Sequence, residues 1–253
     1  MTYCVGMLLD AGLVMLADSR TNAGVDNIST FRKLTVFQRP GQAVFVMMTA
    51  GNLSLAQSVI GQLKEALEDP QEGRPGLFDV ASMFEAARCV GDAIRAVHAR
   101  DAAPLEAFKM EFNVSVILGG QIRGERPRLF HIYPAGNFIE ATGETCYFQI
   151  GEFKYGKPII DRVVNREVRL QRAAKAGLVS MDSTIRSNLT VGPPIDVVTV
   201  KTDEYRVSSH QVIEAEDEYF RLIRASWGEA LIQVTQPRSP CFKLNFHFPI
   251  FRF

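Results

Sequence analysis

Short apolar runs form the first block of the chain and predict two hairpins. The runs cover residues 3–9, 12–17, 34–37 and 43–48, with Asp10-Ala11-Gly12 and Arg39-Pro40-Gly41 at the turns. Asp, Pro and Gly are the residues that tight turns between strands favour. This block therefore predicts antiparallel strands.

The period of the apolar positions changes after Gly51. They recur at helical spacing from Leu53 to Leu67, with Asn52 as the expected N-cap. A second helix is expected over residues 78–99, followed by a linker over 101–104. Strands are then expected over 112–118, 129–133, 138–141 and 146–150, with a hydrophilic turn over 119–126 and the last two strands continuing the same sheet.

The second half of the chain repeats this order. Helices are expected over 156–164 and 167–189, a hairpin over 197–201 and 205–208, and a final helix over 216–231. Strand blocks alternating with helix pairs imply two packed sheets with helices outside. The predicted fold class is α+β, a four-layer α/β/β/α sandwich of two antiparallel sheets flanked by helices. We expect one domain over 1–235 and a Pro-rich tail over 236–253, which docks on a partner subunit or frays.

Composition excludes several classes of protein. The chain has 253 residues, 47% of them hydrophobic, and 28 basic residues balance 28 acidic ones. Without a basic field, no nucleic acid or membrane-surface partner is expected. No apolar run has the length of a membrane span, and the N-terminus lacks the pattern of a signal peptide.

Cysteine and histidine positions indicate neither a metal nor a cofactor. Cys4, Cys89, Cys146 and Cys241 show no CxxC spacing. His98, His131, His210 and His247 share no metal-binding pattern. The sequence therefore predicts reduced thiols in a cytoplasmic protein without a metal site, a cofactor or a disulfide framework.

The start of the chain offers a nucleophile. Thr2 follows Met1, and an initiator methionine is commonly trimmed before a small residue. A free α-amine has a pKa of about 7.7–8.0, which suits a general base. Thr2 would then carry a hydroxyl and the amine that activates it. A threonine at this position is by itself only weak evidence for a nucleophile.

Three further residues could support Thr2. Asp18 ends the second expected strand and Lys33 begins the third. A lysine held there by an aspartate would lower the pKa of the amine and the hydroxyl through its charge. Gly51 lies between a strand and a helix, where its N–H could bind a developing oxyanion. The plainer alternatives are a solvated ion pair and a flexible turn.

These positions coincide in one superfamily. The segments MTYCVG at 1–6, ADSRTNAG at 17–24, FRKL at 31–34 and TAGNL at 49–53 resemble proteasome β-subunits. The segments DNISTFRKL at 26–34, GKPIIDR at 156–162, MDSTIRSN at 181–188 and VGPP at 191–194 resemble more closely the bacterial Anbu (ancestral β-subunit) family. The resemblance covers about residues 1–230.

The resemblance implies an N-terminal-nucleophile hydrolase that cleaves peptides or other amides. It implies Thr2 as the nucleophile, Asp18 and Lys33 as its electrostatic support, and the Gly51 N–H in the oxyanion hole. It also implies a cytoplasmic homo-oligomer, as a closed ring or an open helical turn, with an ATPase or a peptide ligase as a possible partner.

The chain departs from the proteasome pattern at two places. Glu152-Phe153 stands where a serine usually follows the glycine that corresponds to Gly151. Ser187 and Thr190 stand loosely where an Asp-x-x-Ser pair is usual, and Ser183 or Ser187 could replace the missing hydroxyl. Two alternatives therefore remain beside the peptidase: a weakly active or inactive proteasome-like assembly or scaffold protein, and a narrow-specificity amidase for a small or modified peptide.

Overall fold

Two five-stranded antiparallel sheets form the centre of the computed structural model, which describes residues 1–22, 28–69 and 76–236. The first sheet has the strand order β10-β1-β2-β11-β12. Its strands are β1 (Tyr3–Leu9), β2 (Gly12–Asp18), β10 (Tyr147–Gly151), β11 (Ile195–Lys201) and β12 (Ser209–Ile213). The order places β1 between β10 and β2.

The second sheet has the order β5-β6-β7-β8-β9. Its strands are β5 (Leu34–Arg39), β6 (Ala43–Gly51), β7 (Val114–Ile122), β8 (Arg128–Ile132) and β9 (Phe138–Glu140). A separate short pair, β3 (Arg20–Asn22) and β4 (Ile28–Thr30), was not predicted from the apolar pattern, because each strand is only three residues long and most of the six residues are polar.

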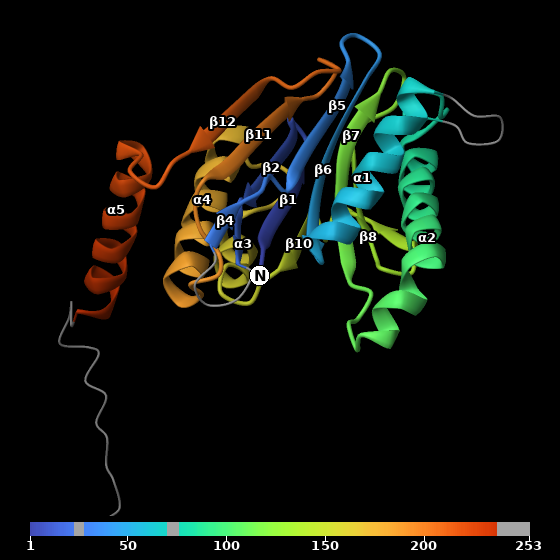
Figure 1. The fold of residues 1–253 in the computed structure, drawn as a ribbon. Coiled ribbons are helices and arrows are strands. Elements are labelled where there is room, and N and C mark those ends of the chain that lie inside the picture. The colour runs from blue at the N-terminus through green and yellow to red at the C-terminus, as the bar shows by residue number, and fades with distance from the viewer. Residues whose placement is uncertain (23–27, 70–75, 237–253) are drawn as a thin grey trace, which may run out of the picture.

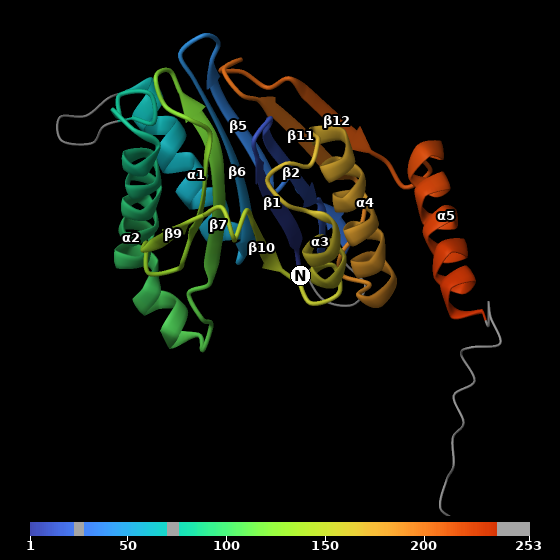
Figure 2. The same ribbon diagram turned by 180° about the vertical axis from the view of Figure 1, so that it is seen from behind.

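Helices cover the outer face of each sheet (Figures 1 and 2). The helices α1 (Leu53–Glu68) and α2 (Met83–Ala107) lie on the second sheet, and α3 (Lys157–Val163) and α4 (Leu170–Ser187) lie on the first. A fifth helix, α5 (Glu218–Thr235), lies beside α4. The predicted four-layer α/β/β/α sandwich is confirmed.

Strand β1 is buried on both faces, and its side chains alternate between two cores. Tyr3, Val5 and Met7 pack in the core beneath α3 and α4. Cys4 and Leu8 pack between the two sheets. Because neighbouring residues of a strand point to opposite faces, both cores fix the register of β1, and with it the position of Thr2.

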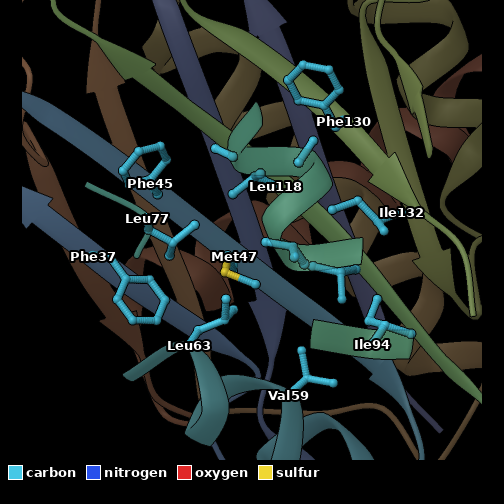
Figure 3. Packing of buried hydrophobic residues seen from close by; sticks show 14 of the residues in the cluster. Phe37, Phe45, Met47, Val59, Leu63, Leu77, Ile94, Leu118, Phe130 and Ile132 are labelled. Atoms are coloured by element: carbon cyan, nitrogen blue, oxygen red, sulfur yellow. The ribbon is translucent and has the colours of Figure 1, made fainter. Parts of the chain in front are cut away.

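A third core lies between the second sheet and its two helices (Figure 3). Phe45 and Phe130 come from the sheet, and Val59 and Ile94 come from the helices; all four side chains are 0% exposed. Burial of such a side chain contributes about 1.5–3 kcal/mol. This packing anchors β6, the strand that ends at Gly51.

The second helix differs at both ends from its prediction over residues 78–99. It begins at Met83, because the Ser82 hydroxyl accepts a hydrogen bond from the Glu85 N–H at 3.1 Å and caps it. It continues to Ala107 through the segment that was expected to be a linker. Leu105 packs against the third core, between the second sheet and its helices. This contact explains why the helix continues past Pro104.

Three predictions for the strands were wrong. Strand β7 runs through Gly119 and Gly120, which were expected in a turn. A Cβ at Gly120 would lie 2.3 Å from the Val44 carbonyl oxygen, so this glycine permits close strand approach. Strand β10 pairs with β1 and therefore belongs to the first sheet. The final hairpin uses Ser209–Ile213 instead of residues 205–208.

The Asn52 cap of α1 gives a modest, testable effect on stability. The Asn52 side chain accepts hydrogen bonds from the Ser54 N–H at 3.0 Å and the Ser54 hydroxyl at 2.8 Å. Asn52→Ala is expected to lower the free energy of unfolding by about 1 kcal/mol, because helix N–H groups lose a partner. Denaturant unfolding measures this loss. Asn52→Ser should restore most of it, and an equal loss in both variants would contradict a capping role.

Gln236 is the last described residue, so the tail predicted over 236–253, including Cys241 and His247, otherwise lies outside the described residues. Within the described residues, no helix is both long and apolar enough to cross a membrane.

Candidate active site

The structure brings three of the four predicted site residues together. Thr2 directly precedes β1, Asp18 ends β2, and Lys33 directly precedes β5. Their exposed fractions are 7%, 0% and 6%. The Lys33 ammonium and the Asp18 carboxylate form an ion pair with Nζ and Oδ1 2.8 Å apart. The same Oδ1 accepts a hydrogen bond from the Tyr3 N–H at 3.0 Å, which joins the pair to the residue after Thr2.

The ammonium group of Lys33 donates three hydrogen bonds. Nζ donates to Asp18 Oδ1, to the Arg20 carbonyl oxygen at 2.6 Å and to the Met1 carbonyl oxygen at 3.4 Å. An ammonium group has three N–H donors, so each acceptor takes one. One acceptor of this buried cation therefore belongs to the residue that precedes Thr2.

Asp18 is bound on both carboxylate oxygens. Its Oδ2 accepts a hydrogen bond from the Gly192 N–H at 3.3 Å. Burial raises the pKa of Asp18, while the charge and hydrogen bond of Lys33 and the two backbone N–H groups act in the opposite direction. The geometry is that of a paired carboxylate held rigidly by the backbone.

The α-amine lies in the field of this pair. The side chain of Met1 is 62% exposed. The pKa of its α-amine lies below the usual value, first through burial and then through the positive charge of Lys33. Asp18 and Glu152 oppose this shift. The surroundings at this end of the chain therefore favour a neutral amine near pH 7.

Gly51 ends β6 in a left-handed conformation, with φ +108°. A Cβ there would lie 2.3 Å from the Asn113 carbonyl oxygen, so the position needs glycine. The nearby Thr49 N–H donates to the Lys33 carbonyl oxygen at 3.0 Å, which connects this end of β6 to the segment of Lys33. No hydrogen bond joins Gly51 to Thr2 among the described residues, so its place in an oxyanion hole stays a prediction.

Gly151 and Glu152 approach Thr2 from the other side of β1. The Glu152 N–H donates to the Thr2 carbonyl oxygen at 2.7 Å. Gly151 has φ +82°, and a Cβ on it would lie 1.9 Å from that same oxygen. The end of β10 therefore fixes the backbone of Thr2.

Asp196 binds residues that lie next to Lys33 and Asp18 in the sequence. This buried carboxylate lies on β11 and pairs with Arg32 at 2.5 Å, directly before Lys33. It also accepts a hydrogen bond from the hydroxyl of Ser19, directly after Asp18, at 3.5 Å, and contacts His210 Nε2 at 2.7 Å. These contacts restrain the backbone on both sides of the site.

Sequence reasoning did not identify the contacts of Gly192, the Arg20 carbonyl group and Asp196. Backbone donors and acceptors carry no residue signature, so only the VGPP segment pointed towards Gly192. Ser183 and Ser187 were suggested as substitute hydroxyls, but neither hydrogen bonds to a site residue within the described part of the chain. Ser180 on the same helix instead contacts the Tyr3 hydroxyl at 2.5 Å.

Two other features do not form an alternative centre. A surface cleft of about 790 Å³ lies between α1 and α2, lined by residues such as Glu65, Arg88 and Asp92, and it includes none of the Thr2 site. Burial raises the pKa of the Cys4 thiol, which makes it a packed apolar residue. No cluster of potential metal ligands occurs among the described residues.

Comparisons with protein-family models and with curated proteins give only one short match. No protein-family model matches the chain. A stretch of 24 residues is 83% identical to Protein YiiM of Escherichia coli (strain K12), so the chain spans about a tenth of that curated relative: 10% of this chain and 11% of that protein are covered. A stretch of this size shows no relationship for the chain as a whole.

Solved structures match nearly the whole chain. Anbu from Yersinia bercovieri is 50% identical, with 92% of this chain and 96% of that chain covered and a TM-score of 0.85. Anbu from Hyphomicrobium sp. strain MC1 is also 50% identical over the same shares, with a TM-score of 0.83. The helical assembly of the Anbu complex from Pseudomonas aeruginosa is 42% identical over 95% and 99%, with a TM-score of 0.87. With such identity over more than nine tenths of its length, and with the proteasome-like sandwich described above, the chain belongs to the Anbu, or ancestral β-subunit, family.

Proposed function

We propose that this protein is a threonine-type peptide or amide hydrolase that uses Thr2 as its nucleophile after removal of Met1. The observation that carries this proposal is the third hydrogen bond of Lys33. Its Nζ donates at 3.4 Å to the Met1 carbonyl oxygen, the atom that leaves with Met1. Removal of Met1 therefore frees one donor of a buried, fixed cation beside the new α-amine and hydroxyl of Thr2.

The reaction begins with the neutral α-amine of Thr2, which takes the hydroxyl proton, directly or through a water molecule. Oγ1 then attacks the amide carbonyl carbon, the amine of the cleaved bond leaves with a proton, and water hydrolyses the resulting ester. Lys33 stabilises the developing negative charge on Oγ1, and Asp18 keeps Lys33 charged and in place. The Gly51 N–H is our candidate for the oxyanion donor.

Intact-mass spectrometry and covalent labelling test this function. Purified protein is expected to lack the mass of one methionine residue and to react with a peptide epoxyketone, which needs both the hydroxyl and the α-amine of an N-terminal threonine. Thr2→Ala should abolish labelling, whereas Thr145→Ala, at an exposed loop position, should leave it unchanged. Retention of Met1, or labelling that survives Thr2→Ala, would contradict the proposal.

We also propose that the chain forms a homo-oligomer. A helical assembly is described for the relative from Pseudomonas aeruginosa, and α5 exposes large apolar side chains such as Leu222 (61%) and Ile232 (58%). Size-exclusion chromatography with multi-angle light scattering tests this point on the purified protein. A distribution of multiples of the subunit mass is expected, and a monomer at micromolar concentration would contradict it.

The departures from the proteasome pattern support two other candidates. An inactive assembly protein of the same fold would form oligomers and retain Met1. A narrow-specificity amidase would lose Met1 and react with the epoxyketone, yet cleave few general peptides. The combination of intact mass, labelling and a peptide-library digest therefore separates the three candidates.

A further inference from the structure

Glu152 is a partly buried carboxylate that the proposed reaction has not used. It follows β10 directly, and its side chain is 14% exposed. Since β1 lies between β10 and β2, Glu152 and Asp18 flank the start of β1 from opposite sides. The hydrogen bond from the Glu152 N–H to the Thr2 carbonyl oxygen, at 2.7 Å, fixes the Glu152 backbone against Thr2.

One carboxylate oxygen of Glu152 lacks a hydrogen-bond donor. Oε2 is fully buried and accepts no hydrogen bond. Its ion-pair partner among the described residues is Lys154, with Nζ at 3.6 Å and a side chain that is 64% exposed. A buried acceptor left without a donor costs about 1–3 kcal/mol. This oxygen can therefore accept a hydrogen bond from a further donor.

The charge of the Glu152 carboxylate reaches the α-amine at the start of the chain. The charge of Glu152 acts on the α-amine of Met1 and raises its pKa, against the lowering by burial and Lys33. Removal of Met1 moves the free amine by one residue, onto Thr2, whose carbonyl group Glu152 already binds. The new amine and the buried Oε2 of Glu152 then belong to two residues whose backbones are already hydrogen bonded.

We propose that the Glu152 carboxylate binds the α-amine of Thr2 and is the positioning residue that holds this amine beside the Thr2 hydroxyl. The inference rests on the proposed function and adds to it a role for a residue outside the Asp18–Lys33 pair. The amine then lies between a cation on one side and a carboxylate on the other, and their balance sets its protonation.

The sign of the expected effect follows from charge. A carboxylate stabilises the ammonium form, so its loss lowers the pKa of the amine. Glu152→Gln keeps the shape of the side chain and removes the charge. The pKa of the Thr2 α-amine is expected to fall by about half to one unit. Epoxyketone labelling at neutral pH is expected to slow about tenfold, because a neutral amide oxygen holds the amine less firmly than a carboxylate does.

Competitive acetylation of the N-terminus measures the amine directly. The full chain is prepared with Thr2 as its first residue, released from a cleavable leader, and acetic anhydride is applied across pH 5–10. The N-terminal peptide is then quantified by mass spectrometry. Glu152→Asp keeps the charge and should leave the amine pKa close to that of the unsubstituted protein. Glu144→Gln removes an exposed carboxylate elsewhere and should change nothing.

The two readouts separate this inference from the proposed function. An unchanged amine pKa in Glu152→Gln overturns the role of Glu152, whatever the labelling shows. A lowered amine pKa with slower Thr2 labelling supports it. A protein that starts at Thr2 and shows the pKa shift, but takes no epoxyketone, keeps the Glu152–amine contact, overturns the catalytic positioning role and counts against the hydrolase itself.

Discussion

Gly151→Ala is expected to lower the free energy of unfolding by about 3–5 kcal/mol and to abolish labelling of Thr2. Gly151 has φ +82°, and an added Cβ would lie 1.9 Å from the Thr2 carbonyl oxygen and 2.6 Å from its carbonyl carbon. Backbone atoms cannot rotate away as a flexible side chain can. Either β10 separates from β1 or Thr2 moves, and both outcomes disturb the hydrogen bond from Glu152.

Gly124→Ala is the matched control for this clash. Gly124 also has a positive φ, +91°, but an added Cβ there would meet nothing within 4 Å. It should therefore show only the cost of the left-handed conformation, about 1–2 kcal/mol, with normal labelling of Thr2. Denaturant unfolding and epoxyketone labelling compare the two. Equal stability losses in both variants would show that contact with Thr2 is not the cause.

Lys33→Met is expected to cost about 3–5 kcal/mol of stability, because it removes one partner of a buried ion pair and leaves the other charge uncompensated. Lys33 and Asp18 are 6% and 0% exposed and 2.8 Å apart. Labelling of Thr2 should be lost as well. Lys157→Met, in an exposed pair with Asp161, should cost less than about 1 kcal/mol. Similar losses in the two variants would refute the buried-pair argument.

The deficit of Lys33→Met should depend on pH. Burial raises the pKa of Asp18, and Lys33 partly opposes this shift, so the pKa rises further in the variant. A carboxyl group whose folded pKa exceeds its unfolded value of about 3.9 loses stabilisation as pH rises through the folded pKa. The difference in unfolding free energy between wild type and variant should therefore grow from pH 4 to pH 7. A deficit that is constant over this range would argue against a charged Asp18.

The periodicity of apolar residues predicted most of the fold, but not the element boundaries that tertiary contacts determine. The alternation in β1 and β2 and the helical stripe of α1 were read correctly because each element has one consistent period. The first turn of α2 was placed too early, although Ser82 and Glu85 have the spacing of a capping box. Gly119 and Gly120 indicate a turn locally, whereas close packing against β6 makes them part of a strand.

Only the side chains of the candidate site could be predicted from the sequence. Thr2, Asp18 and Lys33 form a motif that can be seen in sequence. In the structure Asp18 and Lys33 hydrogen bond to each other and to the residues on either side of Thr2. The restraints from Gly192, Arg20 and Gly151 act through backbone atoms, which any residue carries. Glu152 was interpreted from the sequence only as a missing serine, because its position beside Thr2 depends on the pairing of β10 with β1.

The two-sided burial of β1 limits which changes in chain length the protein can accept. A deletion inside Tyr3–Leu9 would exchange the residues facing α4 with those facing the second sheet. It would also shift Thr2 relative to Asp18 and Lys33, so one lost codon would disturb two cores and the candidate site together. The side chains of the hairpin turn at Asp10-Ala11 are exposed, so a change of length there would leave the register of β1 and both cores in place. Length variation among natural relatives should therefore gather at that turn and be absent from the seven residues before it.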